Sequence, residues 1–116
     1  MDKILIAESE RDLSLSIKRY LELFDIESII ANDGVQALNE FGSDDYQVVI
    51  IDDELSRIKT NDVIKKLKDK KDNIRIILLS SKTINKNQEG CDEVISRPFT
   101  SRELKESLIK VGYALW

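Results

Sequence analysis

The sequence predicts an α/β fold in which helices cover both faces of a five-stranded parallel sheet. Short apolar runs typical of buried strands alternate along the chain with segments that place apolar residues at helical spacing. The run Val48-Val49-Ile50-Ile51 is continuous, as in a strand buried on both faces, and leads directly into Asp52. Five such strands in 116 residues match the doubly wound, flavodoxin-like fold with strand order 2-1-3-4-5 better than a longer dinucleotide-binding sheet.

The first elements follow from apolar spacing and turn residues. Residues 3–7 form the first predicted strand, and residues 11–23 form a helix with one apolar face. Residues 27–31 are a short second strand, which ends in the turn signal Asn32-Asp33-Gly34. A second helical stripe follows at residues 35–41.

The middle of the chain contains the central strand. Residues 42–45 break the second helix, and the central strand is predicted at residues 46–51. Thr60 or Asn61 is expected to cap the next helix, whose apolar positions run to Leu67.

The last third contains two strands and one well-marked helix. The strands are predicted at residues 74–79 and 93–95. Thr100 and Glu103 have the spacing of a capping box, so they predict the start of the final helix. Between residues 80 and 90 the only large apolar residue is Ile84, so a fourth helix there is expected to be shortened or irregular.

Length and composition favour one globular domain over residues 1–116, with 41% hydrophobic and 34% charged residues. The net charge of −4 argues against direct nucleic-acid binding. No apolar stretch approaches the roughly 18 residues of a membrane span. Met1 leads into a strand without a signal peptide, so a cytoplasmic location is expected.

Several classes of site are excluded by the residue types present. The chain has no histidine, which excludes Ser-His and Cys-His nucleophile systems and zinc sites with histidine ligands. The single cysteine, Cys91, rules out an internal disulfide framework. No glycine-rich loop supports nucleotide binding.

Two predicted strands end on an acid. The first apolar run ends at Glu8 and the central run ends at Asp52. In open α/β sheets, ligands bind at the edge where the carboxyl ends of the strands meet. Glu8 and Asp52 therefore predict a cation site at this edge.

Five short pieces of the chain, taken together in their order and spacing, resemble the receiver domain of two-component response regulators. The pieces are residues 4–10, 31–38, 46–52, 76–80 and 97–99. The resemblance covers the whole chain. It implies the flavodoxin-like fold expected above, magnesium-dependent signalling rather than an enzyme, a histidine kinase as one partner, and a downstream output domain or protein as another.

The resemblance also implies roles for individual residues around the phosphoryl group. Asp52 corresponds to the aspartate that accepts the phosphoryl group, and Ser80 and Arg97 correspond to residues that contact it. The bond before Pro98 is expected to be cis, so that the preceding side chain points into the pocket. Val94 occupies the position of the family's aromatic switch residue.

The magnesium site that the resemblance implies consists of Glu8, Asp52 and the backbone carbonyl of Glu54. The family usually has a second acid where this chain has Ser9, which is expected to act as a helix cap or, at most, to hold a metal-bound water. Each missing carboxylate weakens a site for a hard cation, so magnesium binding is expected to be weak.

Further departures surround the site. Arg97 stands where the family has lysine, and it is expected to bridge Asp52 and Glu8 in the resting state. Residues 56–57, Ser-Arg, replace the usual Pro-Gly turn. Together with Ser9 and Val94, these departures indicate an atypical receiver.

Two other functions remain open. The first is a phosphorylation-independent module for protein interaction or dimerisation, which Ser9, Arg97, Val94 and the shortened helix favour. Tyr113, Leu115 and Trp116 exceed what the last helix needs, so they are expected to pack back on the domain, to mediate dimerisation or to mark where a longer protein was cut. The second is a small phosphatase with an aspartate nucleophile, because Asp52-Asp53-Glu54 follows an apolar strand.

Overall fold

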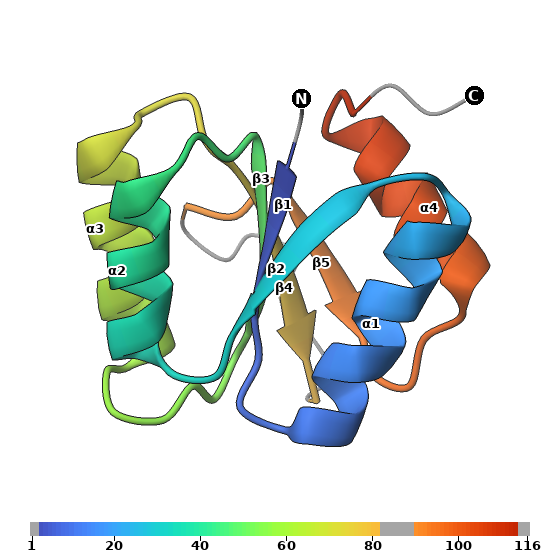
Figure 1. Cartoon of the computed structure of the whole chain (residues 1–116), viewed down its shortest axis with the longest axis horizontal. Helices are drawn as coiled ribbons and strands as arrows, with labels where there is room; N and C mark the ends of the chain where they lie inside the picture. The colour runs from blue at the N-terminus through green and yellow to red at the C-terminus, as the bar shows by residue number, and fades with distance from the viewer. Residues whose placement is uncertain (1–2, 82–89, 114–116) are drawn as a thin grey trace.

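A five-stranded parallel sheet runs through the middle of the computed structural model, which describes residues 3–81 and 90–113 (Figure 1). Its strand order, β2-β1-β3-β4-β5, is the predicted one. The strands are β1 (Lys3–Ala7), β2 (Glu27–Ala31), β3 (Val48–Asp52), β4 (Arg75–Ser80) and β5 (Glu93–Ser96). The central strand begins and ends later than expected, so Asp52 is the last residue of β3.

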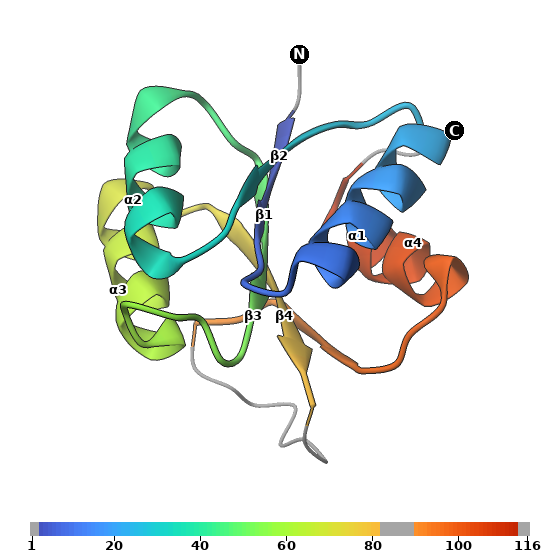
Figure 2. The same cartoon turned by 60° about the horizontal axis from the view of Figure 1, so that its bottom comes forward.

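In the part of the chain that the structure describes, four helices cover the two faces of the sheet. Two of them lie on one face and two on the other, as both views show (Figures 1 and 2). The helices on one face are α1 (Arg11–Leu23) and α4 (Ser101–Lys110), and those on the other are α2 (Gly34–Ser43) and α3 (Thr60–Lys70). The shortened fourth helix expected between residues 80 and 90 falls mainly on residues 82–89, which lie outside the described residues.

The two faces of the sheet carry separate hydrophobic cores. Val49 and Ile51 belong to the core beneath α2 and α3, whereas Val48 and Ile50 belong to the core beneath α1 and α4. All residues of β3 are buried, as expected for a continuous apolar run. Among residues 3–81 and 90–113, no helix is long and apolar enough to cross a membrane.

The start of α3 anchors the end of β3. Thr60 is the first residue of this helix and Lys59 is its N-cap, so the prediction that Thr60 or Asn61 caps the helix is wrong. The buried Thr60 hydroxyl instead donates to the backbone carbonyl of Asp52 at 2.7 Å and accepts from the N–H of Leu55 at 3.1 Å. The loop after β3 is thereby tied to the strand that carries Asp52.

The predicted capping box at the start of α4 is present. The Thr100 hydroxyl accepts from the Glu103 N–H at 3.1 Å, and the Glu103 carboxylate accepts from the Thr100 N–H at 3.0 Å. These two bonds satisfy backbone donors that have no partner within the helix.

Gly34 allows α2 to pass close to the loop after β3. Its N–H donates to the carbonyl of Ser56 at 3.0 Å. A Cβ at this position would lie 2.7 Å from the Cβ of Ile58 and 3.1 Å from the carbonyl oxygen of Ile58. A side chain at residue 34 would therefore push this loop away from the helix.

We expect Gly34→Ala to lower the free energy of unfolding by about 1–3 kcal/mol, because the added methyl group overpacks the contact with Ile58. Gly42→Ala is the matched control, since the nearest atom to a Cβ there is Lys70 Nζ at 3.7 Å. This control should be neutral or stabilising by up to about 1 kcal/mol. Urea denaturation followed by circular dichroism measures both, and equal effects would contradict the close approach at Gly34.

Candidate functional site

Polar side chains at the ends of four strands lie along one edge of the sheet. The strands are parallel, so their carboxyl ends lie together, at the bottom of Figure 1. Asp52 and Ser80 are the last residues of β3 and β4, Glu8 follows β1, and Arg97 follows β5. These four residues are the candidates that the sequence placed at this edge.

Arg97 lies at the centre of this cluster. Its Nη1 is 2.8 Å from Asp52 Oδ1 and 3.6 Å from Glu8 Oε1, and its Nη2 is 3.2 Å from Asp53 Oδ1. The guanidinium therefore bridges Glu8 and Asp52 and also binds a third carboxylate.

The backbone around Arg97 holds its side chain over the edge of the sheet. The Arg97 N–H donates to the carbonyl of Ser80 at 2.8 Å, and the Arg97–Pro98 peptide bond is cis. Only 20% of the Arg97 side chain is exposed. The ion pairs of Arg97 are thus partly shielded from water and are stronger than surface pairs.

Asp53 is a site residue that sequence reasoning did not single out. Its Oδ2 accepts from the Ser80 hydroxyl at 3.0 Å and from the Ser81 N–H at 3.3 Å, while Oδ1 accepts from Arg97. Its own N–H donates to the carbonyl of Leu79 at 2.9 Å. The only available signal was its position directly after Asp52, and that position does not show which way the side chain points.

Burial controls the protonation of the two innermost acids. The side chains of Glu8 and Asp52 are only 2% and 6% exposed. Burial raises the pKa of the Glu8 carboxyl to about 7, against the opposing effects of the Glu10 N–H and Arg97. Burial likewise raises the pKa of Asp52, and Arg97 opposes this shift.

Two carboxylate oxygens in the cluster suit a hard cation. Glu8 Oε1 and Asp52 Oδ1 are buried and accept no hydrogen bond from any residue that the structure describes, so only the charge of Arg97 compensates them. Three carboxylates surround one guanidinium, which leaves negative charge in excess. The residues present therefore fit a magnesium ion.

The described residues offer a cation few carboxylates and a competing positive charge. Within residues 3–81 and 90–113, no three Asp, Glu, Cys or His side chains are grouped so that they could hold a metal ion. Glu8 and Asp52 supply two carboxylates, and Arg97 lies against both of them. A cation must compete with this guanidinium.

The remaining candidates lie at the margin of the cluster. Ser9 is exposed and its hydroxyl accepts from the Ser56 N–H at 3.2 Å. Glu10 is the N-cap of α1, so the expectation that Ser9 caps this helix is wrong. Glu54 is exposed, and its N–H donates to Asp52 Oδ2 at 3.1 Å. Val94 is half-buried and packs against the core beneath α2 and α3.

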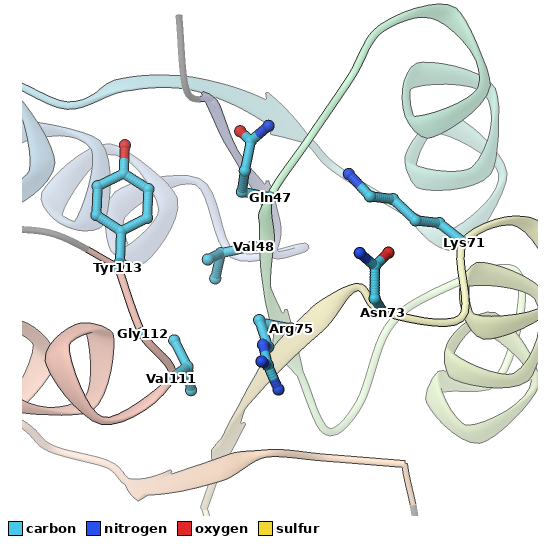
Figure 3. A pocket seen from close by; sticks show the side chains of 8 residues that line it. All are labelled: Gln47, Val48, Lys71, Asn73, Arg75, Val111, Gly112 and Tyr113. Carbon is cyan, nitrogen blue, oxygen red and sulfur yellow. The ribbon is translucent and has the colours of Figure 1, made fainter.

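A separate pocket lies away from this cluster, where the chain enters β3 and β4 and leaves α4 (Figure 3). Both of its cationic side chains have acidic partners, since Lys71 binds Asp45 at 2.9 Å and Arg75 lies 3.7 Å from Asp92. The described residues that line it include no acid: Gln47, Val48, Lys71, Asn73, Arg75, Val111, Gly112 and Tyr113. This pocket therefore offers none of the carboxylates that surround Arg97.

Comparison with protein families and curated sequences gives a consistent result. A family model described as the response regulator receiver domain matches residues 4–109. The response regulator SaeR of Staphylococcus epidermidis is 30% identical over 109 residues, which cover 90% of this chain and 47% of SaeR. The response regulator MprA of Mycobacterium avium is 26% identical over 107 residues, covering 88% of this chain and 47% of MprA. This chain thus spans about half the length of these curated relatives.

Solved structures share the same fold. The response regulator TrrA of Thermotoga maritima, in complex with Mg(2+)-BeF, has a TM-score of 0.87 and 30% identity, and the match covers 96% of this chain and 99% of TrrA. TrrA in complex with the histidine kinase ThkA has a TM-score of 0.86, also at 30% identity, with coverage of 97% and 99%. The chemotaxis response regulator CheY4 of Vibrio cholerae has a TM-score of 0.88 at 19% identity over 96% of this chain and 98% of CheY4, which shows the fold alone.

We expect the raised pKa of Glu8 to make stability depend on pH in metal-free buffer. Because the pKa of this carboxyl is about 7 in the folded state and 4.5 ordinarily, its contribution is full below pH 4.5 and is lost as the pH rises through 7. The free energy of unfolding of wild type relative to Glu8→Gln should fall by about 3 kcal/mol over this interval. Urea titrations with a chelator at a series of pH values measure the difference.

The exposed Glu22 on α1 provides a control for removal of a carboxyl. Glu22→Gln should not reproduce the curve of Glu8→Gln. A difference between wild type and Glu8→Gln that stays constant from pH 4 to pH 8 would show that folding leaves the pKa of Glu8 unchanged.

Proposed function

Because this chain belongs to the family of response regulator receiver domains, we propose that it accepts a phosphoryl group on Asp52 from a histidine kinase. The observation that carries the proposal is the meeting of Asp52, Ser80 and Arg97 at one edge of the sheet, each at the end of a different strand. A nucleophilic carboxylate, a hydroxyl and a cation are the groups that transfer to an aspartate requires.

The transfer exchanges one bond to phosphorus for another. A carboxylate oxygen of Asp52 forms a bond to phosphorus while the P–N bond to the donor imidazole breaks. The electron pair of that bond stays on the imidazole nitrogen, which takes up a proton. The Ser80 hydroxyl and the Arg97 guanidinium would then donate to the phosphoryl oxygens.

Glu8, Asp52 and the carbonyl of Glu54 would hold a magnesium ion in this proposal. Magnesium would neutralise charge on the carboxylate and on the phosphoryl oxygens. Two observations support the proposal: the two buried oxygens of Glu8 and Asp52 that accept no hydrogen bond from a described residue, and the Mg(2+)-BeF complex of TrrA. Arg97 must leave Asp52 and Glu8 before the site can fill, and this movement would couple phosphorylation to the surface around β5 and Val94.

The histidine kinase is proposed as a partner because TrrA forms a complex with the histidine kinase ThkA. A groove beside Arg97 is available for such a partner, between α1 and the loop that follows β5. An output domain or protein is proposed as the downstream partner, since the curated relatives are about twice as long as this chain. The proposal includes a homodimer as a further assembly. It assigns the chain to signalling in the cytoplasm rather than to catalytic turnover.

A second candidate function is a phosphorylation-independent interaction module. The ion pair of 2.8 Å between Arg97 and Asp52 favours it, because the phosphoacceptor is already neutralised by the chain itself. In this alternative, the domain binds its partner through the same surfaces without modification of Asp52.

We expect phosphoramidate with magnesium to add one phosphoryl group to wild type and none to Asp52→Asn, because the amide is not a nucleophile for this reaction. Phosphate-affinity electrophoresis or intact-protein mass spectrometry detects the adduct. Asp33→Asn is the matched control, since it removes one carboxylate after β2 and keeps a side chain that caps α2. Absence of the adduct from folded wild type would favour the interaction module, for which Asp52→Asn should leave partner binding unchanged.

We expect Ser9→Asp to bind magnesium about tenfold more tightly than wild type, because it restores a carboxylate beside Glu8. Titration with magnesium chloride followed by amide chemical shifts gives the dissociation constant. Ser9→Asn is the control for shape without charge, and it should resemble wild type. Equal affinity of all three proteins would place residue 9 away from the cation.

A further inference from the structure

We propose that Asp53 is a built-in competitor for the phosphoryl group. Its carboxylate binds the Ser80 hydroxyl and the Arg97 guanidinium in the resting protein, and it must release both before they can bind phosphoryl oxygens. This inference rests on the proposed function and deepens it, because it gives Asp53 a role in how readily the site accepts a phosphoryl group.

The contacts of Asp53 are those of a bound anion. One carboxylate oxygen accepts from the Ser80 hydroxyl at 3.0 Å and from the Ser81 N–H at 3.3 Å, and the other accepts from Arg97 Nη2 at 3.2 Å. A hydroxyl, a backbone N–H and a guanidinium are the donor types that bind phosphoryl oxygens. Asp53 therefore uses the hydroxyl and the guanidinium that the proposed reaction requires.

The backbone keeps the Asp53 carboxylate in this place. The Asp53 N–H donates to the carbonyl of Leu79, which continues the pairing of β3 with β4 beyond Asp52 and sets residue 53 beside Ser80. On the other side, the Arg97 N–H donates to the carbonyl of Ser80. Three neighbouring strand ends thus present Asp53, Ser80 and Arg97 to one another.

Burial makes these contacts stronger than those of an exposed ion pair. The side chain of Asp53 is 15% exposed and that of Arg97 is 20% exposed, and Ser80 is buried. Ions that are partly removed from water are screened less, and their hydrogen bonds are charge-assisted. A phosphoryl group must therefore displace a carboxylate that is already well bound.

The charge of Asp53 has opposite effects on the two expected ligands. It repels an incoming phosphoryl group and holds two of its donors, whereas it attracts a magnesium ion beside Asp52. If Asp53 is a competitor, removal of its charge should strengthen anion binding and weaken magnesium binding. A residue with only a structural role would change both in the same direction, through the stability of the site.

The experiment compares wild type with Asp53→Asn, Asp53→Ala and Asp33→Asn. Asn preserves the shape of Asp53 without its charge, Ala removes all three side-chain contacts, and Asp33→Asn removes a carboxylate that caps α2. Thermal unfolding monitored by circular dichroism confirms that each variant is folded. The probes are magnesium chloride alone and beryllofluoride at saturating magnesium, each followed by amide chemical shifts.

We expect Asp53→Asn to bind beryllofluoride about tenfold more tightly than wild type, the effect expected from loss of one competing charge-assisted contact. Asp53→Ala should show an effect at least as large. Both variants should bind magnesium alone more weakly than wild type, and phosphoramidate should label them faster. Asp33→Asn should match wild type in each measurement.

The outcomes separate this inference from the proposed function. If wild type binds beryllofluoride and both Asp53 variants bind it equally or more weakly, Asp53 is not a competitor, while the receiver function stands. Binding by the Asp53 variants alone would support the inference and show that Asp53 closes the resting site. If no folded variant binds beryllofluoride or accepts a phosphoryl group, the proposed function fails and the inference fails with it.

Discussion

The arrangement of the site depends on one guanidinium held among three carboxylates at an edge of the sheet that is largely shielded from water. Arg97 contacts Glu8, Asp52 and Asp53, and the first two of these acids are almost fully buried. Without that cation, the acids would repel one another where water screens them poorly. The positive charge also occupies the place where a metal ion would serve the same purpose. The residue that stabilises this cluster is therefore the one that would have to move for the proposed magnesium ion and phosphoryl group to bind.

The scaffold makes this concentration of charge possible. The sheet is buried on both faces, and its parallel strands end together, so residues far apart in the sequence are brought to one edge without irregular backbone in the core. Local contacts then fix the loop after β3: Thr60 binds the backbone carbonyl of Asp52, and Gly34 allows α2 to approach Ile58. The two hydrophobic cores stabilise the fold, and the edge of the sheet carries a partly buried cluster of three acids and one guanidinium.

The same contacts explain why a signalling domain and an interaction module are both compatible with this chain. A receiver needs donors that are available to a phosphoryl group, whereas an interaction module needs a site that stays closed. Here the proposed donors Ser80 and Arg97 are bound by Asp53, and the proposed acceptor Asp52 is paired with Arg97. The balance between these internal contacts and an external ligand determines which behaviour the domain has. That balance is set by a few partly buried ion pairs rather than by the fold.

The sequence by itself determined the strands, their order and the meeting of Glu8 and Asp52 at one edge, and its resemblance to receiver domains added Ser80 and Arg97. Apolar runs and helical spacing report burial directly, and parallel strands must end on the same side of a sheet. Only the tertiary structure decided the partners of Asp53, Ser9 and Thr60. Asp53 binds Ser80 and Arg97, Ser9 binds Ser56, and Thr60 binds the Asp52 carbonyl. These contacts form beyond the ends of strands and helices, where periodicity no longer sets the direction of a side chain and the nearest donors come from distant parts of the chain.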